Sequence, residues 1–521
     1  MSIWLILTSL IALAFLAREI LILAKLSPSR NKKGVLVSYL PWLFRKINQT
    51  MNSLGGDDLR HQRDTNFQEK DTDVVVTSYK DSTTLVFQPV SLKALDQFYT
   101  SDSIKTHTAK LNPTPFTRIF GLFFQNPPKS TFYQTQLKRL FERFDYFGSN
   151  FERLRDNLRQ NTRSVMVTER RFNPINLNNA YLQTAIDDIA SILAFGKSAT
   201  KAGRQNGVSY VRLVRLCCKE NSEYESGWLR TFTFGLAQRF GFDSRYYKIK
   251  RYRGYMAKGW AKLVSELERK LKNGETDKDK LGGAGAGGAG LLGALVKLQR
   301  EQKGTKGEEI GIDDIGVFLE TLIWGVSEKL SSALSSIFAL LVTNPKIFKK
   351  LKEEISIFHN NPGYSLNDLN SNQYLDALIK ECLRFVPTVG TGVTRVVTKN
   401  GLKICEAVLN KGDLVSVPYV GLGMNLGCFE DWMTLNPERY LQQEGSFQKD
   451  VKKLSPFGVG RASCPFEDMA MSLIKLVLVE FLASFEIRRV YGWRMKLEQK
   501  AGSGLYRVVN PLVLAKRRKS N

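Results

Sequence analysis

The sequence has few of the residues from which most metal sites and catalytic triads are built. Its 521 residues include three histidines, which are scattered along the chain at His61, His107 and His359. The sequence therefore does not favour a multi-histidine metal site or a Ser-His-Asp triad. The six cysteines contain no C-x-x-C spacing, and Cys217 and Cys218 are adjacent. This pattern indicates neither a disulfide framework nor a zinc knuckle, and it favours a reducing compartment for the main body.

The chain also lacks internal repeats and a phosphate-binding loop. The stretch 282–293 reads GGAGAGGAGLLG, but no G-K-[ST] follows it, so we predict a flexible Gly/Ala-rich connection. With 43% apolar residues the chain can bury a large core, and its length alone suggests two or three domains.

No charged side chain precedes the first apolar run, which extends from Ile3 to Ala17. After Arg18 and Glu19, a second apolar patch continues to Ala24, and together the two runs are long enough to span a bilayer. Basic residues follow at Lys25, Arg30, Lys32 and Lys33. We therefore predict a single-pass membrane anchor at residues 1–25 with the rest of the chain in the cytoplasm. A cleaved secretory peptide is the competing interpretation, but the charged n-region of such peptides is missing.

After the anchor we expect a hinge and membrane-proximal segment at 26–44, which includes the apolar stretch Val35–Phe44. Short β-branched runs within Asp71–Val90 predict a small sheet. Helical patterns cover Phe172–Phe195 and Gly227–Leu271, and the second interleaves basic and aromatic residues. Such a face could pack on an anionic membrane surface or on a nucleic acid.

The last third contains a lone cysteine in the stretch SPFGVGRASCPF, Ser455–Phe466, directly before the apolar helix pattern Met469–Phe485. Gly458 and Gly460 permit a tight turn close to a flat cofactor, and the helix that follows favours a thiolate at its N-terminal end. These features suit a haem-thiolate site. A free cysteine buried in a turn is the alternative.

This stretch resembles the cysteine-ligand signature of the cytochrome P450 family, F-x-x-G-x-R-x-C-x-G. Phe457, Gly460 and Cys464 occupy their places. The resemblance implies that Cys464 ligates the iron of haem b, and that Phe457 and Gly460 help to seat the cofactor.

Two positions depart from the signature. Ala462 stands at the usual arginine, with Arg461 one residue earlier, and Phe466 stands at the usual glycine. We expect Arg461 to reach a haem propionate and Phe466 to alter the seating of the haem, since it removes a small residue where the helix packs against the porphyrin.

Two upstream motifs support the resemblance. Glu381 and Arg384 are three residues apart, on one helix face, and match the family's E-x-x-R motif. Asn436–Tyr440 reads NPERY and resembles the family's P-E-R-F segment. The resemblance implies that Glu381, Arg384 and Arg439 form a buried charged triad. An E-x-x-R pair by itself is a common surface feature.

Further residues are assigned to the haem propionates by the resemblance. Arg395 occupies a position where the family often has a propionate-binding arginine. The family's tryptophan near residues 131–158 is missing, and Phe132 or Tyr133 with Lys138 or Arg139 are the nearest candidates. A solvated basic helix face is the alternative for each of them.

A long apolar helix pattern, Asp313–Thr343, resembles the family's distal helix, which crosses the haem. Aligning Ser332–Leu334 and Asn344–Pro345 with the family puts Glu328 at the catalytic acid and Lys329 at the threonine of A-G-x-[DE]-T. The proton-delivering alcohol is therefore missing. If the helix is locally distorted, a hydroxyl could come from Ser327, Ser331 or Ser332. A one-residue change of register, or a solvated Glu-Lys pair, is the alternative.

The resemblance implies a mainly α-helical fold with a small β region and a single haem-thiolate catalytic domain over 45–521. The implied activity is NADPH-dependent monooxygenation of an apolar small molecule, with electrons from a diflavin NADPH-cytochrome reductase, at the endoplasmic reticulum membrane. Two other functions stay open. One is an isomerase or dehydratase acting on a lipid peroxide, and the other is a non-catalytic haem-binding or membrane scaffold protein.

The net charge of +26 suits an acidic flavoprotein donor and anionic lipid. It would equally suit nucleic acid, and Lys516–Lys519 resembles a nuclear localisation run. Because the chain carries a predicted membrane anchor, we do not expect nucleic acid as a partner.

Overall fold

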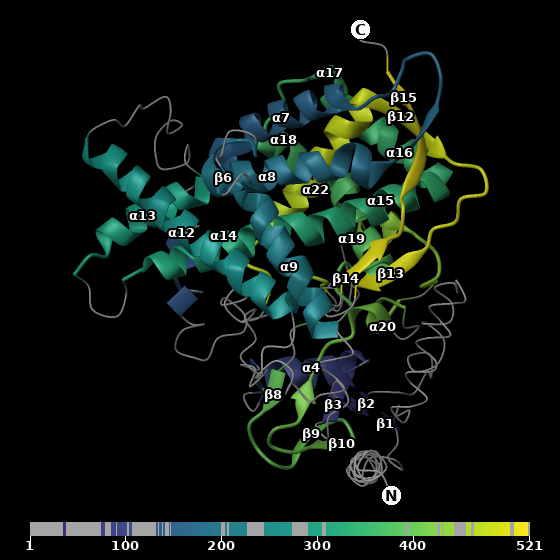
Figure 1. The fold of residues 1–521 in the computed structure, drawn as a ribbon. Helices are drawn as coiled ribbons and strands as arrows, with labels where there is room; N and C mark the ends of the chain where they lie inside the picture. Colours follow the sequence, from purple (N-terminus) through teal and green to yellow (C-terminus); the bar gives the residue numbers. More distant parts are fainter. Residues whose placement is uncertain are drawn as a thin grey trace, which may run out of the picture. The chain divides into compact units, whose positions relative to one another are not determined.

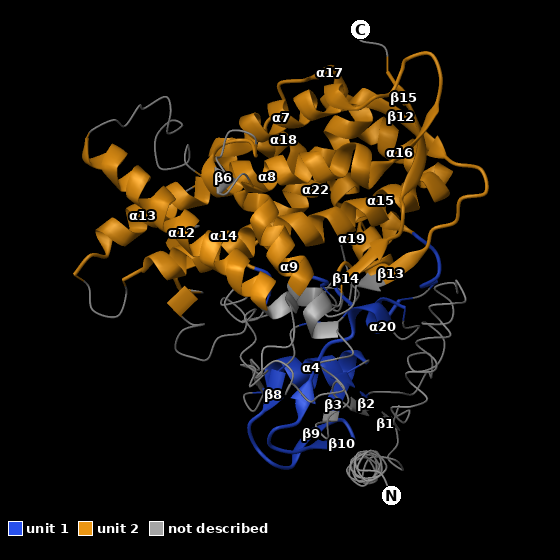
Figure 2. Ribbon diagram, viewed as in Figure 1, with its two compact units in different colours: residues 1–108, 389–435, 443–464 blue, residues 109–388, 436–442, 465–521 orange. Residues whose placement is uncertain are grey.

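The structure is a computed structural model, and it describes most of the chain after residue 90. The described residues are 35–37, 74–78, 85–89, 91–101, 104–106, 132–133, 135–137, 139–140, 145, 147–199, 204–205, 208–226, 244–273, 290–304, 309–390, 392, 395–424, 428–429, 431–441, 455–459, 463–500 and 505–518. The predicted anchor, 1–25, lies outside them. The chain forms two compact units (Figure 2), unit 1 from residues 1–108, 389–435 and 443–464, and unit 2 from residues 109–388, 436–442 and 465–521.

Unit 1 is built on a six-stranded sheet of order β1-β2-β3-β11-β8-β4. The strands are β1 (Val35–Val37), β2 (Val74–Ser78), β3 (Leu85–Pro89), β4 (Ile104–Thr106), β8 (Arg395–Val397) and β11 (Leu414–Val415). The sheet predicted within 71–90 is confirmed as the antiparallel pair β2 and β3. The predicted membrane-proximal segment contributes β1, which pairs in parallel with β2. β-Branched residues favour these strands.

The core of unit 1 forms where this sheet meets a helix and a hairpin. Helix α4 (Leu92–Thr100) is capped by Ser91, whose hydroxyl accepts from the Ala94 N–H at 3.1 Å. The hairpin joins β9 (Leu402–Ile404) to β10 (Ala407–Leu409). The shared apolar core consists of Val74, Phe87, Ala94, Leu95, Phe98, Val397, Ile404, Ala407, Leu409, Val415, Val417 and Leu422. Unit 1 also contains the short helix α20 (Tyr419–Gly423).

Unit 2 is mainly helical, as predicted (Figure 1). Its helices are α7 (Phe151–Ser164), η4 (Asn178–Leu182), α8 (Gln183–Phe195), α9 (Tyr210–Ser226), α12 (Ser244–Lys272), α13 (Gly290–Glu301), α14 (Ile312–Trp324), η6 (Gly325–Leu330), α15 (Ser331–Thr343), α16 (Pro345–Glu354), α17 (Ser356–Asn360), α18 (Leu366–Ser371), α19 (Gln373–Phe385), α22 (Glu467–Ser484) and the 3₁₀ turns η3 (Gly148–Asn150) and η7 (Pro437–Tyr440). Helix α22 is buried along most of its length and packs against α7, α15, α18 and α19.

The predicted long helix is confirmed, with one irregular turn. Helices α14 and α15 continue into one another through η6, a single π-helical turn. Asp314 accepts from the Gly311 N–H at 2.9 Å at the beginning, and Pro345 follows the end. Among the described helices, this one is long and apolar enough to cross a bilayer, but 78% of its most apolar window is buried. It is therefore a core helix of unit 2.

Two local predictions were wrong. The first residues of the predicted helix at 172–195 form β5 (Asn173–Asn176), because Pro174 disfavours a helical residue before it and β15 (Leu512–Arg517) supplies a pairing partner.

Strand β15 also pairs with β12 (Phe485–Arg489). Shorter pairs join β13 (Leu497–Lys500) to β14 (Leu505–Val508) and β6 (Arg204–Gln205) to β7 (Val208–Ser209).

The second difference concerns the predicted flexible segment 282–293, whose last four residues begin α13. Gly290 has a positive φ of 60°, and a Cβ there would lie 2.6 Å from the Leu193 carbonyl oxygen. Glycine is thus required where α13 packs closely against α8. Residues 282–289 lie outside the described part of the chain.

Candidate functional site

The cysteine loop is closed by its own backbone. The Gly458 N–H donates to the Ser455 carbonyl at 3.0 Å, and Gly458 has a φ of 83°, which favours glycine. The Cys464 N–H then donates to the Phe457 carbonyl at 2.7 Å. These bonds fix the two ends of the predicted motif, and α22 begins three residues later at Glu467. Gly460 and Arg461 lie outside the described residues.

The free cysteines differ sharply in their surroundings. Cys382 and Cys217 are buried, and burial raises the pKa of Cys217 to about 12 and that of Cys382 still further. Such thiols resist ionisation and make poor metal ligands. Cys464 is half-buried. Within the described residues no group of three or more His, Cys, Asp or Glu side chains could hold a metal ion. The half-buried Cys464 thiol at the end of the closed loop suits a single thiolate ligand on a cofactor-held iron.

Arg395 is attached to the cysteine loop. Its Nη2 lies 3.4 Å from the Val459 carbonyl oxygen, and its guanidinium stacks 4.8 Å from the Phe98 ring centroid. Burial lowers the pKa of Arg395, although the nearby Tyr99 opposes the shift, and burial raises the pKa of Tyr99 to about 12. A desolvated guanidinium is a suitable partner for a propionate carboxylate. The structure thus brings the predicted Arg395 and the cysteine loop together.

The predicted charged triad is formed within unit 2. Glu381 is fully buried and accepts from Arg384 through two bonds of 2.8 Å. Arg439 adds a third bond at 3.1 Å. The backbone N–H of Asn436 donates to the same carboxylate at 2.9 Å, a contact that the motif does not predict. All four donors converge on one carboxylate, which meets the condition under which a buried charge is tolerated.

This network connects α19 with the turn η7. The Asn436 side chain accepts from the Glu438 N–H at 3.2 Å and so starts the turn that presents Arg439. Burial raises the pKa of the Tyr440 phenol well above its usual range, and the charge of Glu381 adds to the effect. The NPERY motif is therefore a turn built to deliver one arginine and one backbone donor.

On the long helix, the π-helical turn η6 contains both predicted catalytic residues. Glu328 and Lys329 are half-buried. The Lys329 ammonium lies 4.6 Å from the centroid of the Trp324 ring. The turn packs against α8 and α22. Single π turns inside α-helices are frequent at functional sites. In this helix the π turn contains the two residues that the motif singled out, Glu328 and Lys329.

The candidate hydroxyls on this helix differ in their hydrogen bonding. The Ser332 hydroxyl donates to the Tyr506 carbonyl and is engaged in packing α15 against β14. The Ser327 hydroxyl is buried, and within the described residues it has no hydrogen-bond partner. An unpaired buried hydroxyl costs about 1–3 kcal/mol, which a bound water or substrate group would recover. Ser327 is therefore the better candidate of these two.

The remaining predicted propionate partners receive little support. The Tyr133 hydroxyl donates to Asp314 at 2.7 Å, and its ring packs edge-on against Phe318, so it anchors the beginning of α14. Arg139 is half-buried and Lys138 lies outside the described residues. Both stay predictions.

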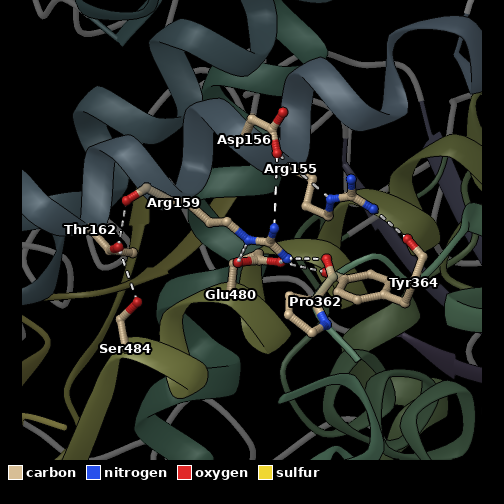
Figure 3. A network of polar contacts seen from close by, with 8 residues as sticks. All are labelled: Arg155, Asp156, Arg159, Thr162, Pro362, Tyr364, Glu480 and Ser484. Atoms are coloured by element: carbon tan, nitrogen blue, oxygen red, sulfur yellow. Dashed lines mark hydrogen bonds and ion pairs between the residues drawn. The ribbon is translucent and has the colours of Figure 1, made fainter. Parts of the chain in front are cut away.

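A second buried carboxylate was missed by the sequence analysis. Glu480 on α22 is 3% exposed and accepts two bonds of 2.9 Å from Arg159 and one of 2.8 Å from the Tyr364 hydroxyl (Figure 3). Arg159 also donates to the Pro362 carbonyl at 2.7 Å. The network fastens α7 and the loop before α18 to α22. Arg159 and Glu480 are 321 positions apart, so no local motif reveals the pair.

Another ion pair links α19 to α22. Lys475 is buried and lies 3.1 Å from Asp376, which also pairs with Lys380 at 2.7 Å. Burial acts to raise the pKa of Asp376, but the hydrogen bond from Lys380 and the charge of Lys475 outweigh it, and the pKa is lowered. The helix after the cysteine loop is thus fixed to the helix of the E-x-x-R motif.

Comparison with known proteins agrees with this arrangement. The family model for cytochrome P450 matches residues 47–507. The chain belongs to the cytochrome P450 family. A solved cytochrome P450 structure, CYP102L1, superimposes with a TM-score of 0.69 over 88% of this chain and 97% of its own, at 14% identity. At that identity the likeness shows the fold alone.

Curated relatives include cytochrome P450 monooxygenase tpeC of Talaromyces stipitatus, 29% identical over 35% of this chain and 36% of its own length. Pisatin demethylase of Fusarium vanettenii is 32% identical over 34% and 36%. Drimenol monooxygenase of Persicaria hydropiper is 31% identical over 37% and 38%. The matches thus span little more than a third of each relative. Membership in the cytochrome P450 family implies haem b as the cofactor, and the lone thiol loop fits that group.

Proposed function

We propose that this cytochrome P450 is a haem-thiolate monooxygenase that inserts one oxygen atom from O₂ into an apolar substrate with electrons from NADPH. The observation that carries the proposal is the closed cysteine loop, in which the Cys464 N–H donates a hydrogen bond to the Phe457 carbonyl. The names of the relatives, among them two monooxygenases, support the reaction class.

In this mechanism the chain holds the cofactor and handles protons. Cys464 would hold the iron as its thiolate ligand, Phe457 would contact the haem, and Arg395 would pair with a propionate. Gly460, Arg461, Lys138 and Arg139 are proposed as further contacts. When bound, a thiolate-ligated haem supplies the chemistry that cleaves O₂.

On the distal side, Glu328 is proposed to relay protons, and the buried Ser327 hydroxyl to order water in place of the usual threonine. Lys329 carries no hydroxyl, and its ammonium lies 4.6 Å from the centroid of the Trp324 ring. The second oxygen atom leaves as water after two electrons and two protons have been delivered.

A second candidate function is isomerisation or dehydration of a lipid peroxide. Lys329 at the position of the proton-delivering alcohol favours it, because a peroxide brings its own activated oxygen and needs no such group. The third candidate is a non-catalytic haem-binding or membrane scaffold protein. It is favoured by the same observation, that Lys329 stands where the family has the proton-delivering alcohol.

The proposed electron donor is a diflavin NADPH-cytochrome reductase, and the proposed location is the endoplasmic reticulum, with residues 1–25 as the anchor and the catalytic domain in the cytoplasm. The net charge of +26 supports docking of an acidic flavoprotein and of anionic lipid.

The test begins with the spectrum. We expect about one haem per chain and the red-shifted ferrous carbonyl band of a thiolate ligand, both lost in Cys464→Ala. Cys382→Ala is the matched control, since burial raises the pKa of this thiol and keeps it protonated. An unchanged carbonyl band in Cys464→Ala would refute the ligand assignment. Substrate-dependent NADPH consumption with reductase then separates a monooxygenase from a peroxide isomerase, and the absence of both activities supports the scaffold.

A further inference from the structure

Helix α12 carries a cationic face that the other helices of unit 2 leave exposed. Its 29 residues include ten lysines and arginines and two acids. The helix packs against α9, α13 and α14, and Figure 1 shows it beside α13 and α14. Its buried apolar residues lie at helical spacing on one side, and they are Ile249, Met256, Trp260 and Val264. This packing determines which side of α12 faces solvent.

The solvent-facing side is basic over most of its length. No Asp or Glu occurs between Ser244 and Ser265. The side chains of Lys250, Arg251 and Lys258 are exposed, and they form no ion pair or hydrogen bond with any residue in the described part of the chain. Their charges are therefore available to an anion outside the protein.

Two ion pairs of the described residues lie along the same helix. Glu220 on α9 is 3.6 Å from Lys248, and Glu266 is 3.9 Å from Lys262. Each of these carboxylates is thus matched by a lysine of its own. The face keeps a net positive charge, which attracts anions over a distance of about a Debye length.

Small residues separate the cations. Gly254, Ala257 and Ala261 are exposed, and a Cβ on Gly254 would meet nothing within 4 Å. Residues three or four positions apart share a helix face, so these small residues lie beside Lys250 and Lys258. A flat surface can therefore approach the backbone of α12, while the long basic side chains reach its anions. A helix of this length offers such a contact over about 43 Å.

An anionic bilayer fits this face better than a nucleic acid or a protein. Because one side of α12 is packed against neighbouring helices, it cannot enter a major groove as a projecting recognition helix does. The small residues offer a protein partner no aromatic anchor of the kind that dominates protein interfaces. Lipid headgroups form a flat array of anions, to which each nearby Lys or Arg adds attraction. Tyr247, 54% exposed, is a residue type that favours the membrane–water interface.

We propose that the exposed face of α12 binds the anionic lipid headgroups of a membrane, with Lys250, Arg251 and Lys258 as contacts. The inference rests on the proposed membrane location and adds to it the surface that meets the lipid. It predicts that this side of unit 2 faces the bilayer.

The test compares the full-length, haem-loaded protein on two kinds of vesicle, phosphatidylcholine alone and phosphatidylcholine with about one third phosphatidylserine. The predicted anchor attaches the chain to both, so the comparison isolates the charge of the headgroups. Acetylation of each lysine by an N-hydroxysuccinimide ester is followed by mass spectrometry. We expect Lys250 and Lys258 to react at least about threefold more slowly on the anionic vesicles. This protection should disappear at about 1 M salt, where the Debye length falls to about 3 Å.

Lys262 on α12 and Lys349 on α16 provide matched variants. They are 64% and 79% exposed, and each lies 3.9 Å from a glutamate four positions later. Lys262→Glu should reduce the protection of Lys258, because it adds a negative charge to the proposed contact face. Lys349→Glu should leave that protection unchanged, and Lys349 itself should react equally on both kinds of vesicle.

Equal reactivity of Lys250 and Lys258 on the two kinds of vesicle would overturn the proposal. A DNA duplex that protects these lysines more than the anionic vesicles do would also overturn it, in favour of a nucleic acid. A failure of the proposed anchor would show separately, because the full-length protein would not sediment with phosphatidylcholine vesicles. A failure of the haem-thiolate assignment would appear in the carbonyl spectrum.

Discussion

Removal of the buried Glu381 carboxylate should destabilise the protein severely. Glu381→Ala removes the acceptor of two Arg384 bonds, one Arg439 bond and the Asn436 N–H bond. The Arg384 and Arg439 side chains, 3% and 10% exposed, would be left as buried cations without their carboxylate. Breaking a buried pair in this way costs roughly 3–5 kcal/mol. Since whole domains are stable by about 5–15 kcal/mol, this loss removes a large part of the total.

The control for this experiment is an exposed pair of similar sequence spacing. Glu353 lies 3.9 Å from Lys349 on α16, and the side chains are 65% and 79% exposed. Glu353→Ala should cost no more than about 0.5 kcal/mol, as for other pairs on helix surfaces. The assay compares urea unfolding midpoints by circular dichroism, together with haem content per chain. If Glu381→Ala carries full haem and unfolds at the same urea concentration as Glu353→Ala, the network does not stabilise the fold.

Three further outcomes are expected. With an uncharged substrate, reductase-driven turnover should release much of its reducing power as peroxide. Lys329→Thr should raise the amount of product formed per NADPH, and Glu328→Ala should lower that amount. If the native protein couples NADPH tightly to product and Lys329→Thr leaves the coupling unchanged, the alignment that puts Lys329 at the threonine position is wrong. Deletion of Met1–Lys25 should weaken membrane attachment measured by fractionation while haem content is retained, and a full-length protein recovered entirely in the soluble fraction would contradict the anchor. Because the pKa of Asp376 is lowered in the folded protein, its stabilisation is present above the unfolded pKa of about 4 and is lost as the pH falls through the folded value. Asp376→Asn should therefore lower the melting temperature at pH 7 and much less near pH 3, and an equal loss at both would refute the ion pair.

The motifs that the sequence reveals are those whose parts lie close together in the chain. Glu381 and Arg384 meet because residues three apart share a helix face, and Gly458 turns the cysteine loop because its φ is positive. The Glu381–Arg384 pair and the long apolar helix could be predicted for this reason. Arg439 lies 58 positions from Glu381 and was assigned to the network through the family resemblance, and Cys464 stays the proposed iron ligand. Family resemblance then joined them into one expected fold.

Tertiary structure decided what depends on distant partners. Strand β5 forms because β15, more than 300 residues later, supplies its hydrogen bonds, and the local pattern alone indicated a helix. Glu480 and Arg159 pair across a similar distance. The π-helical turn that brings Lys329 onto Trp324 has no sequence signature of its own. Sequence thus determined which residues can react or carry charge, while long-range packing decided which of them meet, because contacts between distant segments depend on the whole fold.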